Sequence, residues 1–296
     1  MTQEKLLQDF AGYLRSEGYS RTTGHGYCNQ VRRFLSWLSG ERIRYTEASY
    51  TDLLAYVRFL REDGKKGSTV NGIMNAVRHF YNYLQGSGQT AHNPAETLRV
   101  RNIIRRVPHD LLTWDELERL YHDYPASGVT GRRNKAVIGL LVYQGLTTAE
   151  LTALEVTDVN LMEGRIYIPV TGRSNSRTLK LEAFHVLQLQ KYITRVRSVI
   201  LAMAGKESDR LFISTGKGVR MSNSYVYMQR VLKKLNPKAR DMRQIRASVI
   251  THWLEHYHIR QVQYMAGHRY ISSTEYYRTV HLDGLQEQVD ELHPLG

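Results

Sequence analysis

Apolar side chains along the first hundred residues recur at the spacing of amphipathic helices. Leu6, Phe10 and Leu14 follow one another every four residues, so they share one face of a predicted helix. The same pattern predicts three more helices, which begin at Ser20, at Thr51 or Asp52, and at Ser68. Short turns separate them. Residues 1–92 are therefore expected to fold as a small helical bundle.

Beyond residue 108 the pattern indicates helices together with a short β-segment. Thr113 begins a helix, and the continuous apolar run Ala136–Tyr143 favours a buried helix. Residues 165–170 and 178–181 read as short strands around a polar turn, and they predict a hairpin. Further helices are predicted over residues 183–203, 223–235 and on to the end. The expected fold class is mainly α with a small β-hairpin or sheet: an N-terminal helical bundle and a C-terminal α+β domain over residues 109–296.

Residues 93–108 between the two regions fit neither pattern. The segment Thr97–Arg106 has no acidic residue and no helical stripe, but it holds four arginines: Arg99, Arg101, Arg105 and Arg106. We interpret residues 93–108 as an interdomain linker. An exposed surface strand is the alternative, but the charge favours a segment that lies against phosphates.

Composition narrows the choice of partner. The chain has 41 Lys and Arg residues against 28 Asp and Glu residues, a formal net charge of +13. This excess favours a polyanion such as nucleic acid, although a basic enzyme of another kind stays open. The single cysteine, Cys28, excludes an internal disulfide and a cysteine-rich zinc site. Because no signal peptide or membrane-spanning run is recognisable, a cytoplasmic protein without a membrane partner is expected.

The last fifty residues hold chemistry suited to a phosphodiester. Arg243 and Arg246, then His268 after a glycine, then the pair Tyr276 and Tyr277 follow one another closely. Arginines can hold a phosphate, an imidazole can move a proton, and a phenol can attack phosphorus. The segment therefore predicts nucleophilic attack on a nucleic-acid backbone.

Three longer patterns carry a resemblance to a known family. They are residues 14–38, residues 143–159 with Gly145-Leu146 and Ala149-Glu150-Leu151, and the stretch from Thr251-His252 through Gly267-His268 to Tyr277. In order and spacing they resemble the tyrosine recombinases, the integrase-like site-specific DNA recombinases. The resemblance implies that residues 1–92 form a core-binding DNA-binding domain and that residues 109–296 form a catalytic domain.

The resemblance implies roles for three residues. Tyr277, ten residues after Gly267, matches the nucleophile, Arg246 a phosphate-binding arginine, and His268 a proton-transfer group. Each has a plainer alternative: a packing tyrosine, a surface arginine and a structural histidine. Tyr276 projects in a different direction from the same helix, so we do not expect it to replace its neighbour.

Three positions depart from the family's pattern. The first catalytic arginine of the family falls on Thr147, which supplies a hydroxyl but no charge. Arg243 stands where the family usually has a histidine, and a guanidinium cannot shuttle protons. Arg173 stands in the hairpin turn in place of a general-acid lysine, and Lys180 is the nearest lysine. Our hypothesis is that Arg243 or Arg173 replaces the charge missing at Thr147.

The resemblance also implies partners. It predicts double-stranded DNA recombination sites and a homo-tetramer that works through a Holliday junction, with the segment Leu282–Leu292 exchanged between protomers. Arg32 and Arg33, on the outer face of their helix, join the linker arginines as predicted DNA contacts. No cofactor and no metal are expected, because a phosphotyrosyl bond conserves the energy of the phosphodiester. A role for accessory DNA-bending proteins stays open.

Two other functions are compatible with the departures. One is a DNA-binding protein that has lost strand exchange, and the other is a strand-nicking relaxer of the topoisomerase type. The retained Tyr277, Arg246 and His268 favour an active recombinase. Integration, inversion and dimer resolution all stay open as the biological role.

Overall fold

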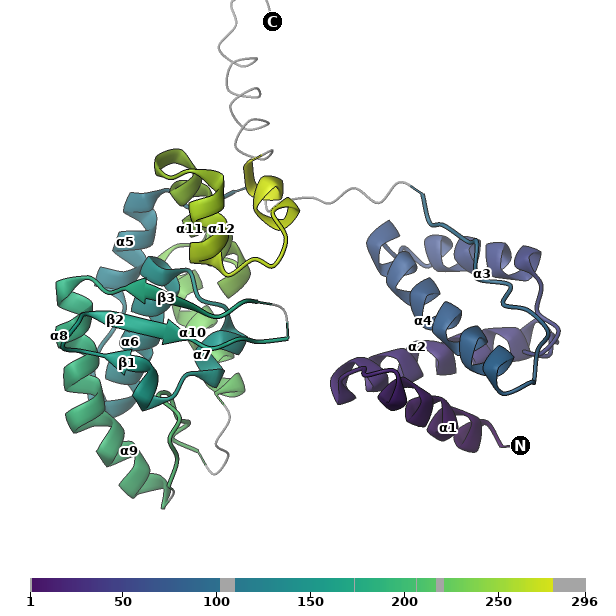
Figure 1. Cartoon of the computed structure of the whole chain (residues 1–296), viewed down its shortest axis with the longest axis horizontal. Helices are drawn as coiled ribbons and strands as arrows, with labels where there is room; N and C mark the ends of the chain where they lie inside the picture. The colour runs from purple at the N-terminus through teal and green to yellow at the C-terminus, as the bar shows by residue number, and fades with distance from the viewer. Residues whose placement is uncertain (1, 102–109, 173, 206, 217–220, 279–296) are drawn as a thin grey trace, which may run out of the picture. The chain divides into compact units, whose positions relative to one another are not determined.

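The structure is a computed structural model that describes residues 2–101, 110–172, 174–205, 207–216 and 221–278. The chain divides into two compact units, Met1–Arg106 and Val107–Gly296, each with its own apolar core (Figure 1). Within the described ranges, no helix combines the length and the apolar character that spanning a membrane requires.

The N-terminal unit is a bundle of four helices, which confirms the predicted fold: α1 (Gln3–Ser16), α2 (Arg21–Gly40), α3 (Tyr50–Glu62) and α4 (Gly67–Gly86). Ser20 caps α2 by accepting the backbone N–H three residues ahead at 3.2 Å. Ser49 caps α3 and forms a capping box with Asp52. Because Ser49 is the cap, α3 begins slightly earlier than the sequence predicts.

Aromatic side chains fill the core of this bundle. Phe10, Phe34 and Phe80 are fully buried, and the rings of Phe10 and Phe80 meet edge to face with centroids 5.5 Å apart. Burying one such side chain stabilises the fold by about 1.5–3 kcal/mol. The apolar stripe recognised in the sequence is therefore what holds the bundle together.

The beginning of the arginine-rich segment packs on this bundle. Asn93 and Leu98 are buried, and the Arg78 side chain of α4 donates to the carbonyls of Ala95 at 3.0 Å and Leu98 at 2.7 Å. These contacts extend the N-terminal unit beyond residue 92, the end expected from the sequence. Arg99 and Arg101 are exposed, whereas Arg105 and Arg106 lie outside the described residues.

The C-terminal unit is helical around a small sheet. Its helices are α5 (Trp114–Asp123), α6 (Gly128–Gln144), α7 (Thr148–Ala153), η1 (Val156–Asp158), α8 (Ala183–Lys191), α9 (Arg197–Ala204), α10 (Ser222–Leu235), α11 (Met242–His256) and α12 (Ile259–Ala266). A π-helical turn, η2 (Tyr192–Val196), joins α8 to α9, so the helix predicted over 183–203 is continuous but locally wider. Residues 272–278 are also helical.

The predicted hairpin is present as β2 (Arg165–Ile168) and β3 (Arg177–Lys180), in an antiparallel sheet of order β1-β2-β3. The first strand, β1 (Val159–Asn160), is too short to predict from alternation. In β3 the side chains of Arg177 and Leu179 are buried and those between and after them are exposed. The end of the hairpin is bonded to the segment after α12, since Asn175 N donates to the Gly267 carbonyl at 2.9 Å.

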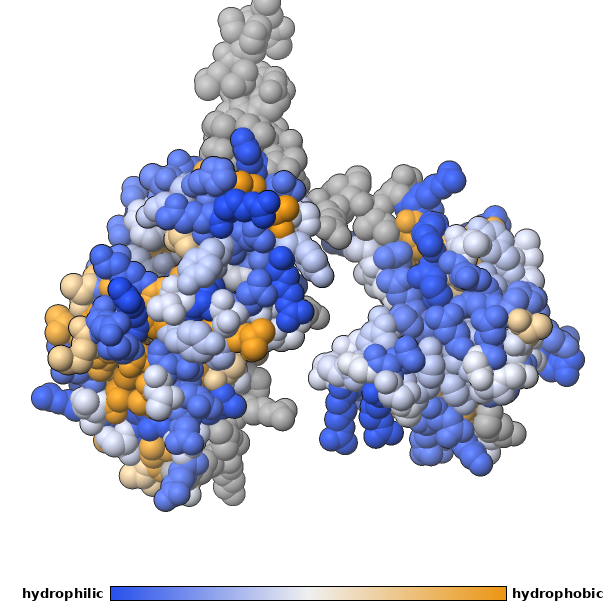
Figure 2. Space-filling view, in the orientation of Figure 1, coloured by the Kyte–Doolittle hydropathy of each residue, from blue (hydrophilic) through white to orange (hydrophobic). Residues whose placement is uncertain are grey.

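Exposed apolar side chains gather over α8 and α9 in the space-filling view (Figure 2). They include Phe184, Leu187, Val199 and Met203. On the face shown, the N-terminal unit is mainly hydrophilic. On this face the two units therefore differ in surface character as well as in fold.

Candidate active site

Arg246 is buried near the start of α11. Asp241 caps this helix by accepting the backbone N–H groups of Arg243 and Gln244. The Arg246 guanidinium is held by carbonyls at the ends of two other helices: it donates to Gly145 after α6 and to Ala266 of α12 at 2.6 Å. Arg246 is only 8% exposed. Its orientation is therefore fixed by the fold.

His268 lies next to this guanidinium. Its Nε2 is 3.4 Å from Arg246 Nη2, and its Nδ1 is 2.9 Å from Thr274 Oγ1. Because a guanidinium only donates, Nε2 must accept, which leaves Nδ1–H to donate to the threonine. Burial, followed by the charges of Arg246 and Arg177, lowers the pKa of His268 to about 4. At neutral pH the imidazole is therefore uncharged.

Tyr277 stacks on His268. The two rings are almost parallel, at 6°, with centroids 5.8 Å apart. Burial raises the pKa of the Tyr277 phenol, while the charge of Arg246 acts in the opposite direction. Tyr276 meets Tyr277 edge-on at 5.6 Å. The structure therefore brings Tyr277, His268 and Arg246 together from three separate segments.

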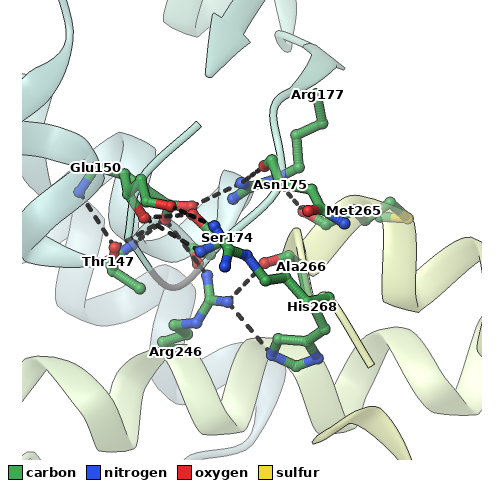
Figure 3. A network of polar contacts seen from close by, with 12 residues as sticks. Thr147, Glu150, Ser174, Asn175, Arg177, Arg246, Met265, Ala266 and His268 are labelled. Atoms are coloured by element: carbon green, nitrogen blue, oxygen red, sulfur yellow. Dashed lines mark hydrogen bonds and ion pairs between the residues drawn. The ribbon is translucent and has the colours of Figure 1, made fainter. Parts of the chain in front are cut away.

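A buried carboxylate connects Arg246 to a second arginine (Figure 3). Glu150 Oε1 accepts from Arg177 Nη1 at 2.6 Å, and Glu150 Oε2 lies 3.7 Å from Arg246 Nη1. Burial alone would raise the pKa of Glu150, but the hydrogen bond and charge of Arg177, the Thr147 backbone N–H and the charge of Arg246 outweigh it and hold the pKa at about 2. Glu150 is therefore ionised at neutral pH.

Thr147 is the N-cap of α7. Its hydroxyl and its backbone N–H both donate to Glu150 Oε2, at 2.9 and 2.8 Å, and the hydroxyl accepts from the Glu150 backbone N–H. This capping box fixes the carboxylate between the two guanidiniums. Thr147 thus orients Glu150 within the network.

Gly267 is required by the packing around Arg177. Its φ is +70°, and a Cβ at this position would overlap the Arg177 guanidinium. A glycine is therefore needed before His268 for two reasons: it ends α12 in the left-handed region, and it leaves room for the buried arginine.

Arg243 and Lys180, also predicted as site residues, lie outside this network. The Arg243 side chain is 93% exposed and lies 3.6 Å from Asp241. Lys180 is exposed at the end of β3, and its carbonyl accepts from Gln144. Arg173 lies outside the described residues. On the N-terminal unit Arg32 and Arg33 are exposed on α2, so both are accessible to a partner.

Within the described ranges, one group of side chains has the spacing of metal ligands: His252, Glu255 and His256 on α11. His252 also stacks on Trp114 with centroids 4.5 Å apart, which is a packing role. The phosphate chemistry suggested by the site needs no metal from this group.

Sequence reasoning misses Glu150, Arg177 and Thr274 as members of the site. Two signals were available. Thr147 and Glu150 have the spacing of a capping box, and Arg177 alternates with Leu179 on one face of a predicted strand. Thr274 has no such signal, because its contact with His268 depends on the turn between α12 and the last helix.

Comparison with known proteins places this geometry in a family. Residues 110–282 match the phage integrase family, and residues 6–89 match the N-terminal SAM-like domain of phage integrases. The tyrosine recombinase XerD of Oceanobacillus iheyensis is 29% identical over 98% of this chain and 99% of that protein. The tyrosine recombinase XerC of the same organism is 25% identical, over 97% of this chain and 87% of that protein.

Solved structures share the fold. The Tn1549 transposon integrase in complex with a circular intermediate DNA has a TM-score of 0.70 at 17% identity, over 92% of this chain and 94% of that one. A lambda integrase tetramer bound to a Holliday junction has a TM-score of 0.67 at 15% identity, over 94% and 77%. With both units matched and the predicted fold confirmed, the chain belongs to the phage integrase family of tyrosine recombinases.

Proposed function

We propose that this protein recombines double-stranded DNA at specific sites by tyrosine-mediated cleavage and rejoining. The observation that carries the proposal is the stacking of Tyr277 on His268 beside the buried Arg246. A nucleophile, a neutral imidazole and a fixed cation at one place are what phosphoryl transfer to a phenol requires.

In the proposed reaction the Tyr277 oxygen attacks the scissile phosphorus. A bond forms between that oxygen and phosphorus, and the bond to the 5′-oxygen breaks, which leaves a 3′-phosphotyrosyl link and a free 5′-hydroxyl. The phenol loses its proton as the new bond forms, the departing 5′-oxygen gains one, and His268 beside the phosphate assists this transfer. Attack by the 5′-hydroxyl of a second strand reverses the step and rejoins DNA.

Arg246 stabilises the charge that develops on the non-bridging oxygens. Its guanidinium is a planar donor that can bind two oxygens at once, and its contacts with Gly145 and Ala266 hold it in place before DNA arrives. No cofactor is needed, because the phosphotyrosyl bond conserves the energy of the phosphodiester. The proposed site is atypical at Thr147, where the family has a further arginine, and at Arg243 and Arg173.

Binding to DNA rests on exposed arginines. Arg32 and Arg33 on α2, with Arg99 and Arg101, offer positive charge to the backbone, and the proposal extends to Arg105 and Arg106. Contacts of this kind position the duplex without reading its sequence.

We further propose a homo-tetramer acting through a Holliday junction. The lambda integrase of the same fold has been solved as a tetramer bound to such a junction. The segment Leu282–Leu292, outside the described residues, would be exchanged between protomers. Accessory DNA-bending proteins remain compatible with this assembly. Mixing two marked DNA sites and scoring junctions and exchanged products would test it.

Covalent capture tests the proposed chemistry. The protein is incubated with nicked duplexes whose sequence around the nick is randomised, and protein–DNA adducts that survive denaturation are recovered and sequenced. Wild-type protein should yield adducts on a selected site. Tyr277→Phe should yield none and should still bind DNA, whereas Tyr276→Phe should retain adduct formation.

Three outcomes would contradict the proposal. Binding to the pool without any adduct from the wild type would favour a DNA-binding protein that has lost strand exchange. Adducts that persist in Tyr277→Phe would remove the assigned nucleophile. Adducts followed by relaxation of supercoiled DNA, without exchange between two sites, would favour a strand-nicking relaxer.

A further inference from the structure

Arg177 is a fully buried arginine in the network that also holds Glu150 and Arg246. Its side chain is 0% exposed. Nε donates to the Met265 carbonyl at 2.7 Å and Nη1 to Glu150 Oε1 at 2.6 Å, while Nη2 has no hydrogen-bond partner within the described part of the chain. Burying such a cation is costly, so the ion pair with Glu150 has to offset much of that cost.

Two guanidiniums share the one carboxylate of Glu150. Arg177 is in hydrogen-bonding contact with it at 2.6 Å, whereas Arg246 is 3.7 Å away. Since Coulomb attraction grows as the charges approach, the pair with Arg177 is the stronger one. The three side chains together carry one net positive charge. That charge resides mainly on Arg246, the guanidinium next to His268.

We propose that Arg177 is a positioning residue for strand cleavage: it neutralises Glu150, so that Arg246 keeps its positive charge for the scissile phosphate. The proposal rests on the proposed function. With Thr147 at the family's first arginine position, the centre without Arg177 would hold one guanidinium and one carboxylate whose charges cancel. Arg177 supplies from β3 the charge that Thr147 lacks.

A charge cycle tests this assignment with four proteins: wild type, Arg177→Gln, Glu150→Gln and the double variant. The readout is the single-turnover rate of adduct formation at saturating DNA, on the site selected by the wild type. Arg177→Gln leaves Glu150 to pair with Arg246 and should slow cleavage by about 100-fold. The double variant removes both charges and should recover to within about tenfold of wild type.

Two further variants separate charge from packing. Arg177→Lys keeps the positive charge and should cleave faster than Arg177→Gln. Arg165→Gln removes from the neighbouring strand β2 an exposed arginine whose Nη1 lies 3.5 Å from Glu163 Oε2. This matched control should cleave at the wild-type rate.

The proposal is overturned if the double variant is as slow as Arg177→Gln while both remain folded at the assay temperature, because Arg177 would then act through packing alone. If Arg177→Gln itself unfolds, the double variant, which buries no unpaired carboxylate, still decides by its rate. Failure of the proposed function looks different, since the wild type would then form no adduct at all.

Discussion

The two units place arginine in opposite environments. Arg32 and Arg33 on α2 are exposed, whereas Arg177 and Arg246 of the C-terminal unit are 2% and 8% exposed. An exposed guanidinium is hydrated and screened by salt, so it contributes to DNA affinity in small increments. A buried one is already oriented, and its charge acts on a reacting phosphate without reorganisation. Affinity and chemistry should therefore respond differently to mutation.

Burial alone does not identify a catalytic arginine. Arg133 of α6 is 1% exposed and donates to the Ile213 carbonyl at 2.9 Å and to Asn134, and it has no acidic partner in the part of the chain that the structure describes. It connects loops to the core. What distinguishes Arg246 is the neighbouring His268 and the stacked tyrosine.

The largest expected effect is that of Arg246→Gln. Removing a fixed cation from the developing phosphate charge should lower the single-turnover cleavage rate by about 100- to 1000-fold, with a much smaller change in DNA affinity. The rate is measured at saturating DNA on denaturing gels. A rate within threefold of the wild-type rate would contradict the catalytic role assigned here to the buried arginine.

The next effect is on stability. Gly267→Ala should destabilise the C-terminal unit by roughly 2–4 kcal/mol, because the added Cβ meets Arg177 and the residue has a positive φ. Gly12→Ala in α1 is the matched control: beyond its own stretch of helix, the added Cβ meets no described atom within 4 Å, and the change should stabilise by about 0.5–1 kcal/mol. Urea unfolding measures both. Equal effects would contradict the packing described for Gly267.

Acid should destabilise the C-terminal unit through its histidines. The pKa of His268 is lowered to about 4 by burial and nearby arginines, and burial lowers the pKa of His185 to about 4. The unfolded chain therefore binds more protons between pH 6.5 and 4, so stability falls as the pH falls through that window.

His268→Gln should reduce this acid-dependent loss by roughly 1–2 kcal/mol, measured by urea unfolding at pH 7 and pH 5. His92→Gln, at an exposed position of the N-terminal unit, serves as the control. An unchanged loss in His268→Gln would mean that this imidazole is not buried next to the guanidinium.

The smallest effect concerns the exposed arginines. Replacing Arg32 and Arg33 by alanine should weaken binding and reduce the slope of log affinity against log salt by about 1.8, at roughly 0.9 per phosphate contact. Filter binding over a salt series measures the slope. A slope equal to that of the wild type would remove this pair from the DNA interface.

Much of the fold could be predicted from the sequence, because local patterns determine it. The periodic apolar residues of α1 to α4 and the alternation around residues 165–181 are local signals, and the elements form where they are expected. The start of α3 and the strand β1 were harder to predict. The first depends on which of several polar residues caps the helix, and the second is only two residues long.

The site was only partly predictable. The spacing from Gly267 to Tyr277 and the resemblance of Arg246 pointed to three residues that the structure brings together. Arg177 escaped notice because its partners, Glu150 and Met265, are 27 and 88 residues away along the chain. The hypothesis that Arg243 or Arg173 replaces the missing charge stays a prediction: the first is exposed, and the second lies outside the described residues.

The most direct test of the account is to identify the residue that becomes joined to DNA. Trypsin should release residues 270–278, cleaved after Arg269 and Arg278, as one peptide from the wild-type adduct. Tandem mass spectrometry of that peptide, after nuclease trimming, distinguishes its tyrosines. The account predicts a nucleotide remnant on Tyr277. A remnant on Tyr276, on Tyr270 or on another peptide would contradict it.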